Sequence, residues 1–153
     1  METPAPTAEH RKLEKMAGKW EGEEMMYEPS PDGKENVAIG RINSRMGIGG
    51  FALIHDYERE RNGRVTFTGH GVFTFDSEEK LYELTWFDCL AARPTLFKGP
   101  FEGEVLRLTH HAPGIHARLT HDLSVPGYLL VSMEMGDDGV NWTKLFDARL
   151  VRQ

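Results

Sequence analysis

Histidine, aromatic and carboxylate side chains gather in a stretch of the chain that is typical of three successive strands. The three alternating runs are Phe51–Tyr57, Val65–Phe75 and Leu81–Asp88. Asn62-Gly63 between the first two runs is a strong hairpin signal, because a type I′ turn needs positive φ at both central residues. We therefore expect an antiparallel three-stranded meander in this stretch.

The hairpin register decides which of these side chains face each other. Counting back from the Asn62-Gly63 turn predicts three pairs, Tyr57 with Thr68, His55 with His70 and Leu53 with Val72. The second turn, Asp76 to Glu79, then sets His70 opposite Trp86. One face of the sheet should carry the candidate binding residues His55, Tyr57, His70, Trp86 and Asp88.

His70 could act as a general base if Asp88 orients its imidazole, an arrangement that fixes the tautomer and suits proton transfer. The sequence offers no nucleophile to accompany such a base. Cys89 should point to the opposite face of its strand, and the chain contains no Gly-x-Ser-x-Gly elbow. His70 and Asp88 are therefore catalytic candidates only for a cofactor-free isomerase or cyclase that moves a proton within an apolar pocket.

His55 and His70 could also be two ligands of a metal ion. A zinc site needs a third protein ligand, for which Asp88 and His121 are the nearest candidates. Imidazoles on adjacent strands lack the tight spacing of a zinc motif and are more often a hydrogen-bonded interior pair. We expect no metal and no other cofactor.

The opposite face of the same three strands is also apolar in this register. It carries Ile54, Val65, Phe67, Phe73, Phe75, Leu81 and Phe87. A large apolar patch on an outer surface usually marks an interface. We therefore predict a homodimer through these strands.

Length and composition indicate one soluble domain. The chain has 153 residues, a net charge of -6 and a single cysteine. The negative charge argues against a nucleic-acid partner, and the lone Cys89 favours a reducing compartment. With no signal peptide and no run long enough to span a membrane, we expect a cytoplasmic protein. Residues 1–7 should be a disordered lead-in, and residues 8–153 the domain.

The rest of the chain is typical of an all-β protein. A short helix is expected over about Ala8–Ala17, followed by strands over Lys19–Tyr27 and Val37–Met46 around a loop at Pro29–Gly33. Two further hairpins follow, Val105–His111 with Ile115–Leu123 and Leu129–Met135 with Trp142–Val151. The total is nine to ten antiparallel strands, and a sheet that long usually closes. We predict a closed up-and-down barrel.

The later hairpins add two candidates to the binding set. Pairing across Pro113-Gly114 sets Leu108 opposite Leu119 and Leu106 opposite His121, which places His121 on the apolar, inward phase. Pairing across the next turn, at Pro126-Gly127, sets Leu119 opposite Met133 and His121 opposite Val131. Pairing across Asp138-Gly139 sets Met135 opposite Trp142 and Val131 opposite Phe146. We therefore expect His121 and Trp142 to line the interior.

Several short motifs resemble those of known barrel families. Gly18-Lys-Trp20-Glu-Gly22 resembles the start of lipocalin and nitrobindin-like barrels, and it is accompanied by Gly69-His70-Gly71, Trp86-Phe87-Asp88, Met133-Glu134-Met135 and Asp138-Gly139. Together they are similar to an uncharacterised bacterial family of lipocalin-like (calycin-type) barrels. The resemblance implies a barrel with a cavity, but no activity. Nitrobindin-like barrels hold haem through a His near the C-terminus, and this chain has no His after His121, so another His would have to substitute.

The function that we predict from the sequence is binding or carriage of a small, mostly apolar or aromatic molecule in the barrel. Two alternatives stay open at this point. One is the cofactor-free enzyme that uses His70 and Asp88, and the other is a haem or metal protein.

Overall fold

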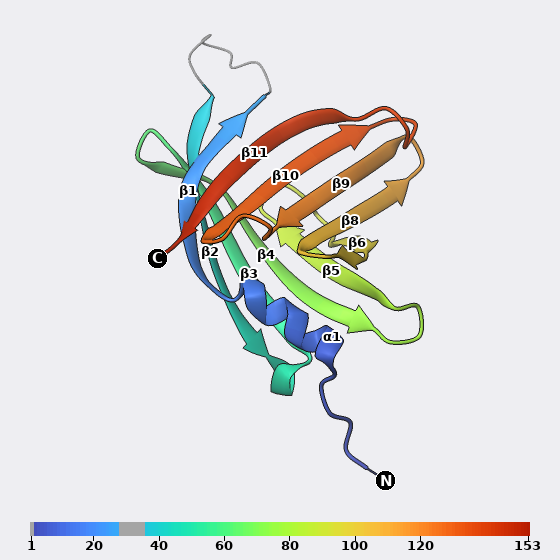
Figure 1. Ribbon diagram of the computed structural model, residues 1–153. Coiled ribbons are helices and arrows are strands. Elements are labelled where there is room, and N and C mark those ends of the chain that lie inside the picture. The colour runs from blue at the N-terminus through green and yellow to red at the C-terminus, as the bar shows by residue number, and fades with distance from the viewer. Residues whose placement is uncertain (1, 28–35) are drawn as a thin grey trace.

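The computed structural model describes residues 2–27 and 36–153, and in these residues it confirms the predicted all-β fold. The strands form one antiparallel sheet in the order β6-β5-β4-β3-β2-β1-β11-β10-β9-β8-β7, and β6 also pairs with β8. This last pairing closes the sheet into a barrel (Figure 1). Because β6 and β7 are two parts of one path interrupted at Pro100, the closed circuit contains ten strands among the described residues.

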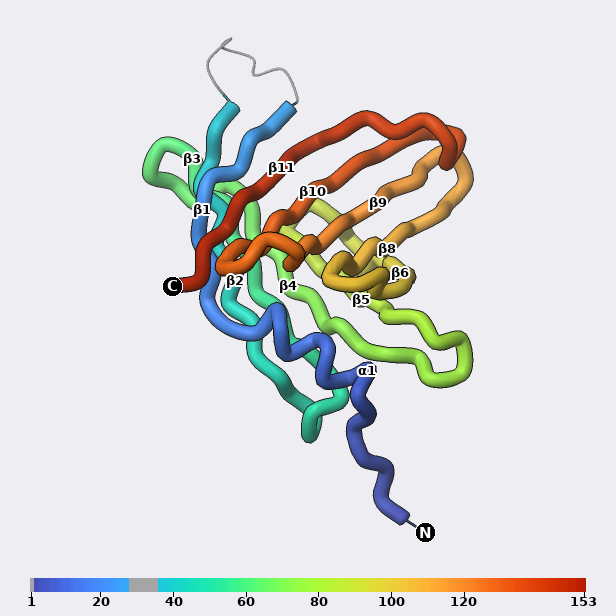
Figure 2. The backbone as a smooth tube through the Cα atoms, in the orientation of Figure 1, coloured from blue at the N-terminus to red at the C-terminus, as the bar shows by residue number. Residues whose placement is uncertain are grey.

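The strands have the following bounds: β1 Gly18–Met26, β2 Val37–Gly47, β3 Ala52–Arg61, β4 Arg64–Asp76, β5 Leu81–Asp88, β6 Thr95–Gly99, β7 Phe101–Glu102, β8 Val105–Ala112, β9 Ile115–Asp122, β10 Tyr128–Gly136 and β11 Thr143–Arg152. The backbone trace shows β1 between β2 and β11, so the first and last strands lie side by side (Figure 2). The predicted loop Pro29–Gly33 lies outside the described residues.

A short helical segment covers one end of the barrel. It consists of α1, Ala8–Arg11, and the 3-10 helix η1, Lys12–Met16, close to the predicted range (Figure 1). Its buried Leu13 and Met16 pack on the barrel core, where the Trp20 indole N–H donates to the Met16 carbonyl at 3.0 Å. No helix in the described residues is both long and apolar enough to cross a membrane. Residues 2–7 form no helix or strand, and their disorder stays a prediction.

The predicted register of the central meander is wrong by one residue. The turn itself is as expected, with φ of 51° at Asn62 and 76° at Gly63. A β-bulge then shifts the pairing of β3 with β4 between positions Arg59 and Glu60 of β3. Thr66 is the extra residue on β4. Beyond the bulge, Asp56 rather than His55 pairs with His70. A shift of one residue turns every side chain of a strand to the other face.

The same inversion corrects the interpretation of both faces of β4. The pairing with β5 sets Gly71 opposite Trp86 and Phe73 opposite Leu84. Phe73 is fully buried, and Phe67 lines the cavity. The homodimer was predicted from an apolar patch on the outer face. That patch does not exist as predicted, since several of its aromatic residues face inward. The homodimer stays a prediction without that support.

The later registers are partly as expected. Leu108 pairs with Leu119, and His121 pairs with both Leu106 and Val131, as predicted. The last hairpin is shifted by one residue at its turn, where Met135 lies opposite Thr143. A second bulge, between Met133 and Glu134, adds another residue to the shift, so Val131 lies opposite Ala148. Trp142, which was expected to pair with Met135, precedes β11 instead.

Replacing Trp20 by Ala should destabilise the covered end of the barrel. Trp20 is 3% exposed, and truncating a buried Trp typically lowers the free energy of unfolding by about 3–5 kcal/mol. Urea unfolding of the two proteins measures the difference. Trp142→Ala, outside the barrel, is the matched control, with an expected loss below about 1 kcal/mol. Equal losses in the two variants would contradict this assignment.

Candidate functional site

The barrel encloses a cavity of about 530 Å³. Most of its lining is aliphatic, aromatic or methionine side chains. Its deep part is bounded by Ile42, Phe73, Leu84, Leu119 and Leu150, and its outer part by Met26, Phe67, Leu90, Ile115, Met135 and Leu145. In an antiparallel barrel the second group lies near the turns opposite the helix-covered end. The site is therefore an apolar pocket with one covered end.

A charged cluster lies on the wall formed by β1 and β3. The Glu24 side chain is fully buried, and Arg59 donates to it from Nε at 2.8 Å and from Nη2 at 3.3 Å. The Tyr57 hydroxyl lies 2.7 Å and 2.6 Å from the two Glu24 carboxylate oxygens. Burial, and then the charge of Glu24, raise the pKa of Tyr57, so its hydroxyl keeps the proton that it donates. The carboxylate is thus held by three donor groups.

Arg59 keeps part of its donor capacity for other partners. Its guanidinium lies 5.3 Å from the Phe67 ring centroid and 5.1 Å from that of Phe146, within the range of cation–π contacts. In the described part of the chain its Nη1 atom has no hydrogen-bond partner. Arg59 can therefore donate from Nη1 to an acceptor in the cavity while it neutralises Glu24.

Two buried imidazoles, His55 and His121, lie at the deep part of the cavity. Their ring centroids are 6.1 Å apart and the rings are nearly perpendicular. His55 Nδ1 lies 2.8 Å from the Ser44 hydroxyl, whereas His121 Nδ1 is a buried atom without a partner among the described residues. Burial lowers the pKa of His55 to about 3, with the neighbouring His121 adding to the effect, and lowers that of His121 to about 4. Both rings are neutral at pH 7.

Trp86 and Asp88 line the wall formed by β5. The indole N–H donates to Asp88 Oδ2 at 2.9 Å, and Asp88 Oδ1 accepts the backbone N–H groups of Leu90 and Ala91, each at 2.9 Å. The Asp88 side chain therefore connects the tryptophan to the loop that follows β5. Its carboxylate has no contact with His70.

The structure separates two residues from the predicted site. His70 points outward and its Nδ1 lies 2.7 Å from Asp56, on the outer face of β3. The pair of His70 and Asp88 therefore does not form. Trp142 also lies outside the cavity, where its ring stacks 4.5 Å from the Arg118 guanidinium. His55, Tyr57, Trp86, Asp88 and His121 do line one cavity, as expected.

Sequence reasoning missed Glu24 and Arg59 although a signal for both was present. Glu24 is in the alternation phase of Trp20, and Arg59 is in the phase of His55 and Tyr57. An acidic and a basic residue in inward phases of two strands that both flank β2 predict a buried ion pair.

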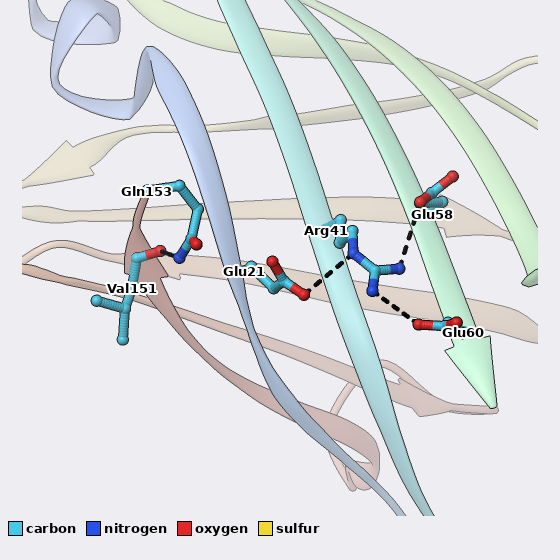
Figure 3. Close-up of polar contacts among 6 residues, drawn as sticks. All are labelled: Glu21, Arg41, Glu58, Glu60, Val151 and Gln153. Carbon is cyan, nitrogen blue, oxygen red and sulfur yellow. Dashed lines mark hydrogen bonds and ion pairs between the residues drawn. The ribbon is translucent and has the colours of Figure 1, made fainter. Parts of the chain in front are cut away.

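The outer face of the same strands shows the opposite arrangement. Arg41 of β2 lies between three carboxylates, with its guanidinium 3.1 Å from Glu21, 3.4 Å from Glu58 and 2.7 Å from Glu60 (Figure 3). The Arg41 side chain is 36% exposed. This is a solvated surface network, in contrast to the buried ion pair of Glu24 and Arg59 on the inner face.

Residues 5–151 match the model of a family described as "Protein of unknown function (DUF1579)". The chain belongs to this family. Comparison with curated proteins gave no match. The crystal structure of Rv2717c from M. tuberculosis is similar, with a TM-score of 0.67 and 15% sequence identity over 96% of this chain and 98% of that chain. At this identity the likeness shows the barrel fold alone. The narrower resemblance to lipocalins and nitrobindins stays a prediction.

Removing Arg59 should destabilise the protein because Glu24 would keep a buried charge without its cation. We expect Arg59→Met to lower the free energy of unfolding by about 3–5 kcal/mol. Adding Glu24→Gln should recover much of that loss. A double-mutant cycle by urea unfolding measures the coupling between the two residues. Strictly additive losses would contradict the pairing.

The two buried histidines should make stability depend on pH. An unfolded imidazole titrates near pH 6.5, whereas the native rings accept protons only near their pKa values of about 3 and about 4. As the pH falls below 6.5, the unfolded chain binds more protons, so the native state loses stability. Together the rings should remove about 3 kcal/mol between pH 6.5 and pH 5.

Urea unfolding at the two pH values measures this loss. His55→Gln and His121→Gln should each reduce it, whereas the exposed His111→Gln serves as the control. A pH dependence that both buried-site variants leave unchanged would contradict the assignment.

Proposed function

We propose that this barrel binds a small, uncharged and mostly apolar molecule in its interior cavity. The observation that carries the proposal is an apolar cavity in which the buried charges are already paired with each other. A volume of about 530 Å³ lies within the range of small-molecule pockets.

Charge compensation inside the cavity favours a neutral ligand. Glu24 is neutralised by Arg59 and also accepts the hydroxyl of Tyr57. His55 and His121 are neutral at pH 7 because burial lowers their pKa values. An anionic ligand would therefore lose its hydration without gaining an unpaired cation, and that loss is costly in an apolar site.

The few polar groups can orient the ligand without supplying most of its affinity. Arg59 Nη1 can donate a hydrogen bond to a carbonyl or ether oxygen near the charged cluster. The imidazoles of His55 and His121 can form hydrogen bonds at the deep part of the cavity. Apolar pockets with a small number of placed polar groups are typical of small-molecule carriers.

The alternative of an enzyme depended on His70 as a base oriented by Asp88. These two residues cannot act together, because His70 lies on the outer surface while Asp88 lines the cavity. Binding without chemistry needs no such pair. The haem and metal alternative makes a different prediction, namely a Soret band or stoichiometric metal in the purified protein.

A matched pair of ligands tests the proposal. Isothermal titration of the protein with 1-decanol and with decanoate compares chains of equal length that differ in charge. We expect 1-decanol to bind at least about tenfold more tightly at pH 7.5, since the carboxylate must be desolvated.

Two variants test where the alcohol binds. Ala117 is 5% exposed and lines the cavity, so Ala117→Phe should fill part of the space and weaken binding of 1-decanol at least tenfold. Thr120→Phe, on the outward phase of the same strand, is the control and should leave the affinity unchanged. Absence of binding by both probes, or equal affinities in the two variants, would contradict the proposal.

A further inference from the structure

Two inward-facing glycines give Trp86 an unusual position on the cavity wall. Gly69 and Gly71 of β4 pair with Asp88 and Trp86 of β5. A Cβ atom added to Gly69 would overlap Cζ2 and Cη2 of the indole. One added to Gly71 would lie 3.1 Å from Trp86 Cε3 and 2.7 Å from Leu84 Cδ1. The six-membered ring of the indole therefore lies directly against the β4 backbone, in space that any other residue would occupy.

The edge of this indole is also fixed. Its N–H donates a hydrogen bond to Asp88, and two backbone N–H groups of the following loop donate to the same carboxylate. Because the only polar atom of the side chain is satisfied, a ligand gains nothing from that edge. What Trp86 offers to the cavity is the flat face of its ring.

Protein rings border this face without stacking on it. The His55 and Tyr57 rings each lie 6.3 Å from Trp86 between centroids and are tilted by 56° and 51°. In the ten-strand circuit β11 is five steps from β5, so it forms the opposite wall. On that wall the inward residue Ala148 carries only a methyl group, and the flexible Met133 lies on the adjacent β10. Phe146 and Leu150 of β11 line the same cavity, and Trp86 lines it from β5, so the space available to a ring beside the indole is that of the cavity of about 530 Å³.

We propose that the ligand contains a planar aromatic ring that stacks on the face of Trp86. This inference depends on the proposed binding function and specifies its ligand class. Offset stacking of aromatic rings adds affinity beyond the area buried, and a fixed platform loses little side-chain entropy on binding. Met133 on the facing side can contact the other face of the ring through its polarizable sulfur.

A second matched pair of probes distinguishes the effect of a planar aromatic ring in the ligand from the effect of the ligand's hydrophobicity. 2-Acetylnaphthalene and 2-acetyldecahydronaphthalene have the same carbon skeleton and the same carbonyl, and only the first is planar. We expect the planar compound to bind about 3- to 10-fold more tightly by isothermal titration. Its ring protons should shift upfield in the ¹H NMR spectrum of the complex, because protons above an indole face are shielded.

Variants then assign the effect to Trp86. Trp86→Leu should abolish the preference for the planar compound and the upfield shifts, whereas Trp142→Leu makes the same change outside the cavity and should preserve both. The ligand comparison in the unmodified protein decides the question even if Trp86→Leu fails to fold.

The outcomes distinguish the two proposals. Equal or tighter binding of the saturated compound, or downfield shifts of the naphthalene protons, would overturn the stacking inference and leave the binding function standing. Failure of both compounds and of 1-decanol to bind would overturn the binding function itself.

Discussion

Closure of the sheet is the constraint on which the rest of this structure depends. Once β6 pairs with β8, every strand has one inner and one outer face, and all inward side chains share the same enclosed volume. A polar group that points inward is then stabilised if it finds a partner among the other inward residues. Glu24, Tyr57 and Arg59 satisfy this condition together, although they come from two strands that do not pair with each other.

The same constraint explains why a bulge of one residue changes the candidate site. Thr66 of β4 has no residue opposite it on β3. From that point the inward positions of β4 are glycines and phenylalanines instead of His70 and Val72. The outward His70 meets Asp56 on the surface. The small inward residues leave room for the large ring of Trp86. The bulge in β4 therefore turns the predicted base His70 outward. It turns Gly69 and Gly71 inward, where they make room for Trp86.

The interior combines properties that favour binding over catalysis. Its carboxylates are engaged, Glu24 by Arg59 and Tyr57, and Asp88 by Trp86 and the following loop. The imidazoles of His55 and His121 are kept neutral by burial. What stays available is an apolar volume, one flat aromatic face and a few hydrogen-bonding atoms. These features are the basis for proposing a ligand that is recognised by its shape and its lack of negative charge.

Alternation, turn chemistry and chain length were sufficient to predict the all-β barrel, the short N-terminal helix and the β8–β9 and β9–β10 registers. These features depend on local patterns, and the Pro113-Gly114 turn has no bulge beside it. The inward positions of His55, Tyr57 and His121 were predictable for the same reason, since each follows from the phase of its own strand. Trp86 and Asp88 were assigned to the same face through a pairing of Trp86 with His70 that does not form. They face inward because Gly71 pairs with both His55 and Trp86. Only the tertiary structure decided the faces of His70 and Trp142. A bulge follows from how a strand bends to close the barrel, and no short stretch of sequence encodes that global requirement.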